Sequence, residues 1–254
     1  MRGFAGAILR NREYATYLNG MYEEGLNPDE VLNQVGDPEA FIGELRDAYR
    51  DRQLRRRQFI DSLSDEVKAE WIDGEAVYHS PAREAHNWTS TGIITLLSDY
   101  SRYVESVSVR VEKAMVEAGE NNFEPDICLF RQPDGSLPRD MVVYPRPDLA
   151  VEILSKRTAE RDLGTKKLEY ARAGTTEYWV VDADAQTVRQ FGNDGDGRFV
   201  ERRRLGLGDT LESVLLPGLR FPLEAIWEPA VSARWTARLV VGAAEREGWD
   251  LDAL

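Results

Sequence analysis

Three acidic residues in apolar, strand-like runs are the first candidates for chemistry: Asp126, Asp148 and Glu152. Alternation along the run PDLAVEIL puts Asp148 and Glu152 on one face and the larger aliphatic residues on the other. A carboxylate among apolar residues has to be paired, hydrogen-bonded or bound to a metal, because burying it alone is costly. Considered alone, Glu152 is explained equally well by an ordinary pairing with a nearby Arg or Lys.

A second group follows Glu152 at helical spacing. Asp162, Lys166 and Tyr170 are four residues apart, so a helix would place them on one face. Two strand carboxylates can hold a hard divalent cation, and a nearby lysine can stabilise charge on a phosphate or orient the attacking water. The combination suits metal-assisted phosphodiester hydrolysis. The alternative for Asp162 and Lys166 is an ordinary helical ion pair.

Asp126 is the preferred partner of Glu152 in such a site. Two adjacent strands could then each supply one ligand to the same ion. Asp148 precedes Glu152 by four residues on the same strand, which places it about 13 Å away along that strand. That separation is too long for a single ion.

The elements that would position these residues begin with a helical segment of 58 residues. Helix starts of the type N-cap, proline, acid occur at 27–30 and 37–39. The second leads into apolar residues at helical spacing: Phe41, Ile42, Leu45 and Tyr49. We expect this stripe to mediate self-association. The basic run 52–57 that follows is read as a solvated helix end, with a phosphate-backbone grip as the alternative.

Beyond residue 68 the pattern alternates between strands and helices. Asp73-Gly74 predicts a two-residue hairpin turn between short strands. Helices are predicted over 86–104, over 160–174 and after Pro229. Strand-like runs cover 104–111, 125–130, 147–154, 177–182, 187–191 and 199–205. This order predicts an α/β (α+β) fold in which helices pack on a mixed sheet. We expect three parts: 1–58, 59–228 and 229–254.

The segments EWIDGEAVYHSPAREAH, EPDICLF and PDLAVEILSKRTAERDLGTKKLEYARAGTTEYWVVD together resemble the Uma-type restriction-endonuclease family of the PD-(D/E)xK nuclease superfamily. The resemblance spans residues 60–228 and is strongest over 147–182. It implies a restriction-endonuclease-like fold and an endonuclease that uses Mg²⁺ or Mn²⁺ to cleave DNA, as a homodimer or higher homo-oligomer. It also implies Asp126 and Glu152 as metal ligands, with the Ile153 carbonyl as a third.

The sequence departs from the superfamily motif at one position. Leu154 occupies the place of the (D/E)xK lysine, and the Uma-type pattern offers Lys166, or its neighbour Lys167, instead. Glu70 and His86 resemble further family positions near the first core helix. His86 could bind a substrate phosphate or orient Asp126, and the simpler interpretation is a residue satisfied locally at a helix start.

Composition limits the remaining alternatives. The 254 residues carry 32 basic and 45 acidic side chains, a net charge of −13. One cysteine and two histidines argue against disulfides and against zinc sites built on either residue. No run has the length of a membrane span, so we expect a cytoplasmic protein without membrane partners. The acidic balance keeps two alternatives open: a catalytically inactive binding or assembly module, or a nuclease acting on RNA or small phosphorylated substrates.

Overall fold

The computed structural model describes residues 36–64, 67–104, 107–131 and 137–247. These residues fall into two compact units, the first ending at His79 and the second beginning at Ser80. The predicted helix start at 27–30 lies outside the described residues. None of the described helices is both long and apolar enough to cross a bilayer.

The first unit contains a long helix and a hairpin. Helix α3 (Pro38–Asp61) begins as predicted, with Asp37 as N-cap accepting a hydrogen bond from the Ala40 N–H at 3.0 Å. Strands β1 (Ala69–Ile72) and β2 (Glu75–Tyr78) pair antiparallel around Asp73-Gly74. Both turn residues have positive φ, 51° and 86°. That is the geometry of a type I′ turn, so the hairpin prediction is confirmed.

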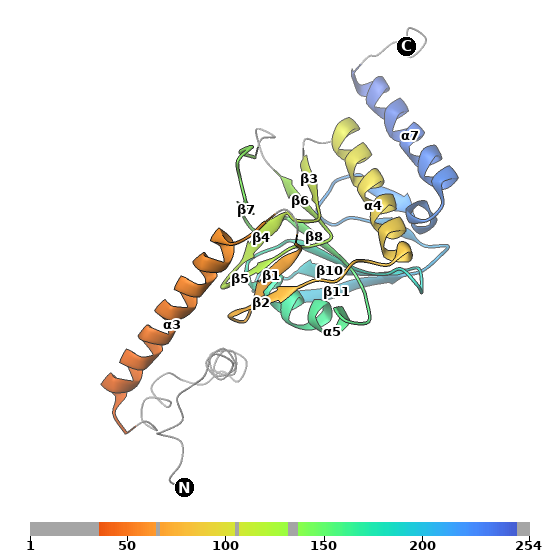
Figure 1. Ribbon diagram of the computed structural model, residues 1–254. Coiled ribbons are helices and arrows are strands. Elements are labelled where there is room, and N and C mark those ends of the chain that lie inside the picture. Colours follow the sequence, from red (N-terminus) through yellow and green to blue (C-terminus); the bar gives the residue numbers. More distant parts are fainter. Residues whose placement is uncertain (1–35, 65–66, 105–106, 132–136, 248–254) are drawn as a thin grey trace. The chain divides into compact units, whose positions relative to one another are not determined.

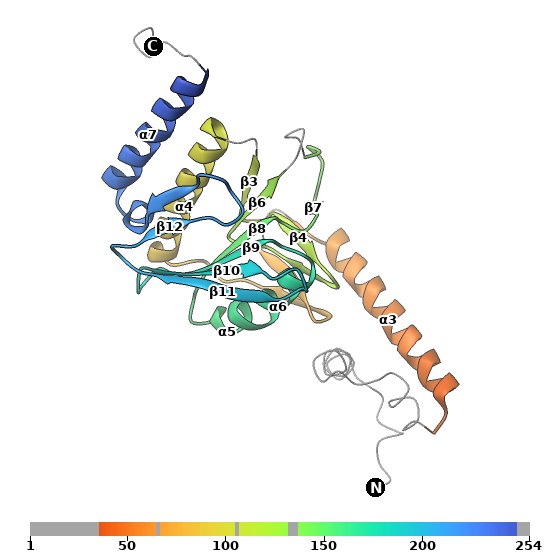
Figure 2. The same ribbon diagram turned by 180° about the vertical axis from the view of Figure 1, so that it is seen from behind.

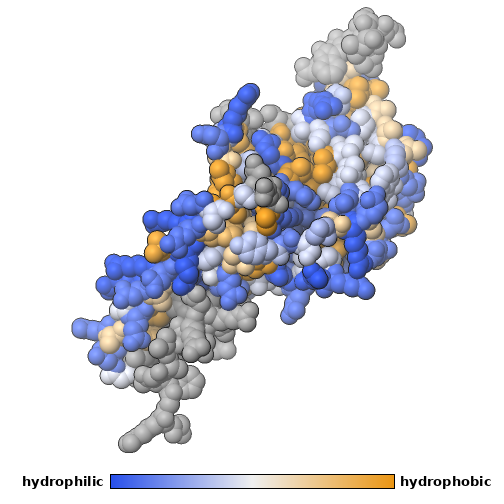
Figure 3. Space-filling view, in the orientation of Figure 1, coloured by the Kyte–Doolittle hydropathy of each residue, from blue (hydrophilic) through white to orange (hydrophobic). Residues whose placement is uncertain are grey.

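The apolar stripe of α3 is only partly covered. Ile42 and Tyr49 are 42% and 44% exposed, and Figure 3 shows small apolar spots among hydrophilic residues along this helix. Near the end of the helix, Phe59 packs on Trp71 of β1 with ring centroids 5.5 Å apart. The helix therefore contacts the hairpin through its last turns.

The second unit is built on a six-stranded mixed sheet in the order β11-β10-β9-β8-β6-β3. Its strands are β3 (Val107–Val111), β6 (Ile127–Arg131), β8 (Leu149–Ile153), β9 (Glu177–Asp182), β10 (Thr187–Asn193) and β11 (Phe199–Leu205). Only the β8–β9 pair is parallel within this sheet of the described chain. The predicted mixed sheet flanked by helices is confirmed.

Two helices cover one face of this sheet. Helices α4 (Glu84–Tyr103) and α7 (Pro229–Glu247) lie side by side (Figure 1), with the 3₁₀ turn η2 (Leu223–Ile226) against α4. Trp227 Nε1 donates to Thr89 Oγ1 at 2.8 Å, and Thr236 Oγ1 donates to Asp99 Oδ2 at 2.6 Å. Gly92 permits the close approach, because a Cβ there would lie 1.8 Å from the Ile226 carbonyl oxygen.

The crossover from β8 to β9 covers the other face (Figure 2). It consists of α5 (Ala159–Arg161), the π-helical turn η1 (Asp162–Lys166) and α6 (Lys167–Arg172), and it ends at Gly174 with φ 89°. Tyr170 packs against Tyr178 of β9 with ring centroids 5.5 Å apart. On this side Cys128 is fully buried, and burial raises the pKa of its thiol.

Five shorter strands were not predicted. Strand β4 (Met115–Ala118) pairs antiparallel with β5 (Asn121–Phe123) and parallel with β7 (Val143–Tyr144). Strand β12 (Thr210–Glu212) pairs antiparallel with β13 (Arg220–Pro222). Residue 104, expected at the start of a strand, instead caps the end of α4.

Candidate active site

The two preferred acids lie next to each other on neighbouring strands. The antiparallel register pairs Ile127 with Val151, so one step further along each strand brings Asp126 beside Glu152. Both carboxylates are buried, at 6% and 3% exposure. The Ile153 N–H donates to Asp126 Oδ2 at 2.8 Å. Strand pairing therefore brings the two acids to adjacent positions on neighbouring strands.

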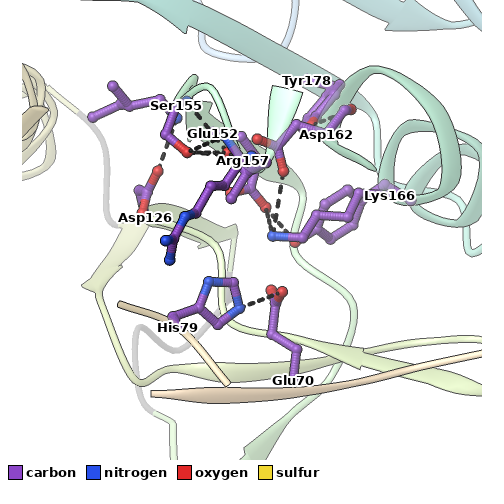
Figure 4. Close-up of polar contacts among 12 residues, drawn as sticks. Glu70, His79, Asp126, Glu152, Ser155, Arg157, Asp162, Lys166 and Tyr178 are labelled. Atoms are coloured by element: carbon purple, nitrogen blue, oxygen red, sulfur yellow. Dashed lines mark hydrogen bonds and ion pairs between the residues drawn. The ribbon is translucent and has the colours of Figure 1, made fainter. Parts of the chain in front are cut away.

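Lys166 extends from the crossover to the same acids. Its Nζ donates to Glu152 Oε1 at 2.9 Å and lies 3.6 Å from Asp162 Oδ1 (Figure 4). The Tyr170 hydroxyl also donates to Glu152 Oε1, at 3.3 Å. Lys166 is only 2% exposed, and the neighbouring carboxylates offset the cost of burying its charge.

The π-helical turn supplies this geometry. Asp162 and Lys166 begin and end η1, and the Tyr178 hydroxyl holds the Asp162 carbonyl at 2.9 Å. Single π turns within α-helices are frequent at functional sites. Sequence spacing predicted that both side chains share a face, but it predicted an ordinary α-helix.

The structure distinguishes the two neighbouring lysines. Lys167 contacts a different strand, where its Nζ lies 4.5 Å from the centre of the Phe191 ring in β10. Leu154, at the motif position, continues the strand by donating its N–H to the Val181 carbonyl at 2.8 Å. Of the two lysines, Lys166 is therefore the one in contact with Glu152.

His86 contacts the site from the first turn of α4. Its Nε2 lies 3.1 Å from Asp126 Oδ2, the oxygen that also accepts from the Ile153 N–H. Three interpretations of His86 are open at the sequence level: binding a substrate phosphate, orienting Asp126, or being satisfied locally at the helix start. This contact is compatible with His86 orienting Asp126.

Glu70 lies in the first unit. It is a buried residue of β1, and its Oε2 lies 2.8 Å from His79 Nε2. Sequence reasoning missed His79. The hairpin register pairs Glu70 with Val77, so His79 is the diagonal neighbour on the same face. The turn at Asp73-Gly74 fixes this register, so the diagonal placement of Glu70 and His79 could have been predicted from the sequence.

Two other acids of the matching motifs have structural partners. Asp148 Oδ2 accepts the Arg131 N–H at 2.7 Å, at the other end of the β6–β8 pair. Glu177 is fully buried and accepts from Trp179 Nε1 and Gln190 Nε2, both at 2.6 Å. These acids hold strands and loops together.

The loop after β8 adds a residue that sequence reasoning did not single out. Arg157 follows β8, and its guanidinium donates to Ser80 Oγ at 2.7 Å. Ser155 organises the loop by accepting the Thr158 N–H at 3.2 Å. The sequence feature that could have identified Arg157 is its position as a basic residue shortly after the strand that carries Glu152.

The donor set is chemically suited to Mg²⁺ or Mn²⁺. Within the described residues, no cluster of three or more His, Cys, Asp or Glu side chains is arranged around a common ion position. Mg²⁺ is commonly bound through one or two carboxylates, with water and substrate phosphate completing its shell. Asp126 and Glu152 provide such a pair, and the backbone of Ile153 lies beside them.

Comparison with known proteins identifies a family and a similar fold. The Uma2 family model, described as "Putative restriction endonuclease", matches residues 53–224. A similar solved structure is that of "a putative nuclease belonging to DUF820" from Anabaena variabilis, with 17% sequence identity and a TM-score of 0.54. The match covers 66% of this chain and 94% of that chain, and it shows a shared fold. None of the curated proteins matches the chain.

Proposed function

Because the chain belongs to the Uma2 family, described as "Putative restriction endonuclease", we propose that it is a metal-dependent endonuclease that hydrolyses phosphodiester bonds in DNA. One observation carries the proposal. Lys166 extends from the crossover to Glu152, and Glu152 lies beside Asp126 on the neighbouring strand. This arrangement restores, from a different element, the lysine that is missing at position 154.

Each residue of the site has a proposed role. Asp126, Glu152 and the Ile153 carbonyl would hold Mg²⁺ or Mn²⁺, which when bound supplies positive charge at the phosphate and acidifies a water molecule. The Lys166 ammonium stabilises negative charge on the phosphate oxygens or orients the attacking water. Its contacts with Glu152 and Asp162 hold it in place.

The remaining residues have supporting roles in this proposal. His86 orients Asp126 through Oδ2, and Tyr170 fixes Glu152 through Oε1. Glu70, held by His79, is the additional acid that the family resemblance implies, and we propose it as a peripheral participant. DNA as substrate and assembly into a homodimer are likewise proposed from the family.

A cleavage assay with Glu152→Gln tests the function. We expect wild-type protein to cut plasmid or linear duplex DNA with Mg²⁺ or Mn²⁺ and to stop when EDTA is added. Glu152→Gln should lower the rate about 10²-fold or more, because it removes a metal ligand and the partner of Lys166. Glu245→Gln, at an exposed position on α7, is the matched control and should cut normally. Full metal-dependent cleavage by Glu152→Gln would contradict the proposal.

The second candidate is a catalytically inactive binding or assembly module, favoured by the net charge of −13 and by Leu154. The position of Lys166 weakens the argument from Leu154, because a lysine reaches the acids by another route. The same assay run with single-stranded RNA and small phosphodiesters separates this candidate from a nuclease with other substrates. An inactive module cleaves none of these substrates in any divalent metal.

A further inference from the structure

A groove between the crossover and the start of β11, whose lining does not include Glu152, contains a second set of cationic side chains. It has a volume of about 260 Å³ and is lined by η1, α6 and the start of β11. Lys167 and Arg198 contribute the positive charge, and Leu163, Leu168 and Phe199 contribute apolar surface. This combination of cationic and apolar side chains suits a ligand in which an anionic group is attached to a less polar part.

The walls of the groove are fixed by hydrogen bonds. Asn193 Nδ2 donates to the carbonyls of Ala171 and Thr175 at 2.8 and 3.0 Å, which ties the β10–β11 turn to the end of α6. Within the turn, the Arg198 N–H donates to Asp194 Oδ1 at 3.2 Å, and the Asp194 N–H donates to the Arg198 carbonyl at 3.0 Å. The backbone of Arg198 is therefore anchored while its side chain is exposed.

Positive charge near Lys167 is only partly neutralised. Lys167 and Arg189 both lie over the Phe191 ring, at 4.5 and 5.1 Å from its centre. Burial first, and then the charge of Arg189, lower the pKa of Lys167. The carboxylate of Glu201 is engaged by Arg189 and by Arg204. Among the described residues, no carboxylate lies within ion-pair distance of Lys167.

We propose that this groove binds a phosphate group, held by Lys167 and Arg198, with Phe199 and the leucines against the attached sugar or base. Lys167 and Arg198 are the charged residues of the groove lining, and both are cationic, so a phosphate is their chemical complement. Lys167 directly follows Lys166 in the chain. The expectation that the phosphate belongs to a nucleic-acid strand extending from the acidic site rests on the proposed function.

Binding to fluorescent oligonucleotides in EDTA tests the groove without any cleavage. We expect Lys167→Met combined with Arg198→Gln to weaken binding about tenfold or more at low salt. The slope of log affinity against log salt should fall by about 0.7 to 0.9, the change expected for the loss of one phosphate contact. Lys167→Arg should retain binding. Arg220→Gln, an exposed charge on β13, is the matched control and should bind like wild type.

A second probe identifies the source of the phosphate. Weaker binding of the double variant to the oligonucleotide supports a strand phosphate, and weaker binding to a free nucleoside monophosphate alone supports a small phosphorylated ligand. The proposed phosphate site is wrong if the double variant binds both probes as tightly as Arg220→Gln does. Thermal melting checks that all variants are folded.

Failure of this proposal is distinguishable from failure of the proposed nuclease. Cleavage with a divalent metal tests the site at Glu152, and oligonucleotide binding in EDTA tests the groove, whose lining does not include Glu152. If wild-type protein cleaves no substrate in any divalent metal while the double variant loses oligonucleotide binding, the nuclease assignment fails and the phosphate groove remains.

Discussion

Lys166 is a buried cation in contact with two carboxylates. Its contributions to catalysis and to stability both depend on these contacts. Its Nζ lies 2.9 Å from Glu152 and 3.6 Å from Asp162, with 2% of the residue exposed. A buried ion pair is weak evidence for stability as such, but removing one partner leaves an uncompensated charge. Catalytic and structural effects should therefore appear together when Lys166 is replaced.

Lys166→Met should both inactivate and destabilise the protein. We expect cleavage to fall about 10²- to 10³-fold, the usual effect of removing a donor that stabilises a transition state. The free energy of unfolding should fall by about 3 to 5 kcal/mol, because buried carboxylates lose their cation. Urea unfolding measures the second quantity, with Arg238→Met on the exposed side of α7 as the matched control. Unchanged unfolding would show that the Lys166 contacts contribute nothing to stability.

The sequence predicted this site in part. Asp126 was preferred over Asp148 by a distance argument along one strand, and the register agrees with that preference. The choice between Lys166 and Lys167 was open, because it depends on a π turn that residue spacing does not encode. The pairing of Glu70 with His79 was missed because diagonal contacts across a hairpin become visible only after its register is known.

At the scale of elements, the contact between α4 and η2 is among the tightest in the second unit. Gly92 faces the Ile226 carbonyl oxygen so closely that no side chain fits between them. Trp227, the residue directly after η2, donates a hydrogen bond to Thr89 of α4. Glycine at this position of α4 therefore reflects packing, although glycine normally weakens a helix.

Gly92→Ala should destabilise the fold. A Cβ 1.8 Å from a backbone oxygen forces α4 and η2 apart, and overpacking of this kind costs about 1 to 3 kcal/mol or more. Gly43→Ala in α3 is the matched helical control. No atom lies within 4 Å of its added Cβ, so it should be neutral or stabilise by up to about 1 kcal/mol. Thermal melting of both variants checks the pair, and equal melting temperatures would contradict the prediction.

Element length determined how well each element was predicted. The long helix α4, the apolar strands β8 and β9 and the turn at Asp73-Gly74 each carry a clear local pattern. The five short strands have two to four residues each, too few for alternation to be recognised. Their pairing depends on contacts with distant parts of the chain.

At the scale of the whole molecule, a metal site should couple to stability. A cation that binds only the native state raises the free energy of unfolding by about 2.7 kcal/mol at a hundredfold excess over its dissociation constant. We expect Mg²⁺ or Mn²⁺ to raise the melting temperature of wild type relative to EDTA, and Asp126→Asn to abolish that shift. A shift of equal size in Asp126→Asn would place the ion elsewhere.

Cys128 is the chain's single thiol, and it lies in β6 two positions after Asp126. Because it is fully buried and its pKa is raised, the side chain stays a shielded, protonated thiol at neutral pH and does not react with alkylating reagents. Alkylation requires β6 to become accessible. The rate at which Cys128 is alkylated therefore reports how often β6 opens next to Asp126. It measures the local stability of the proposed catalytic centre without any substrate.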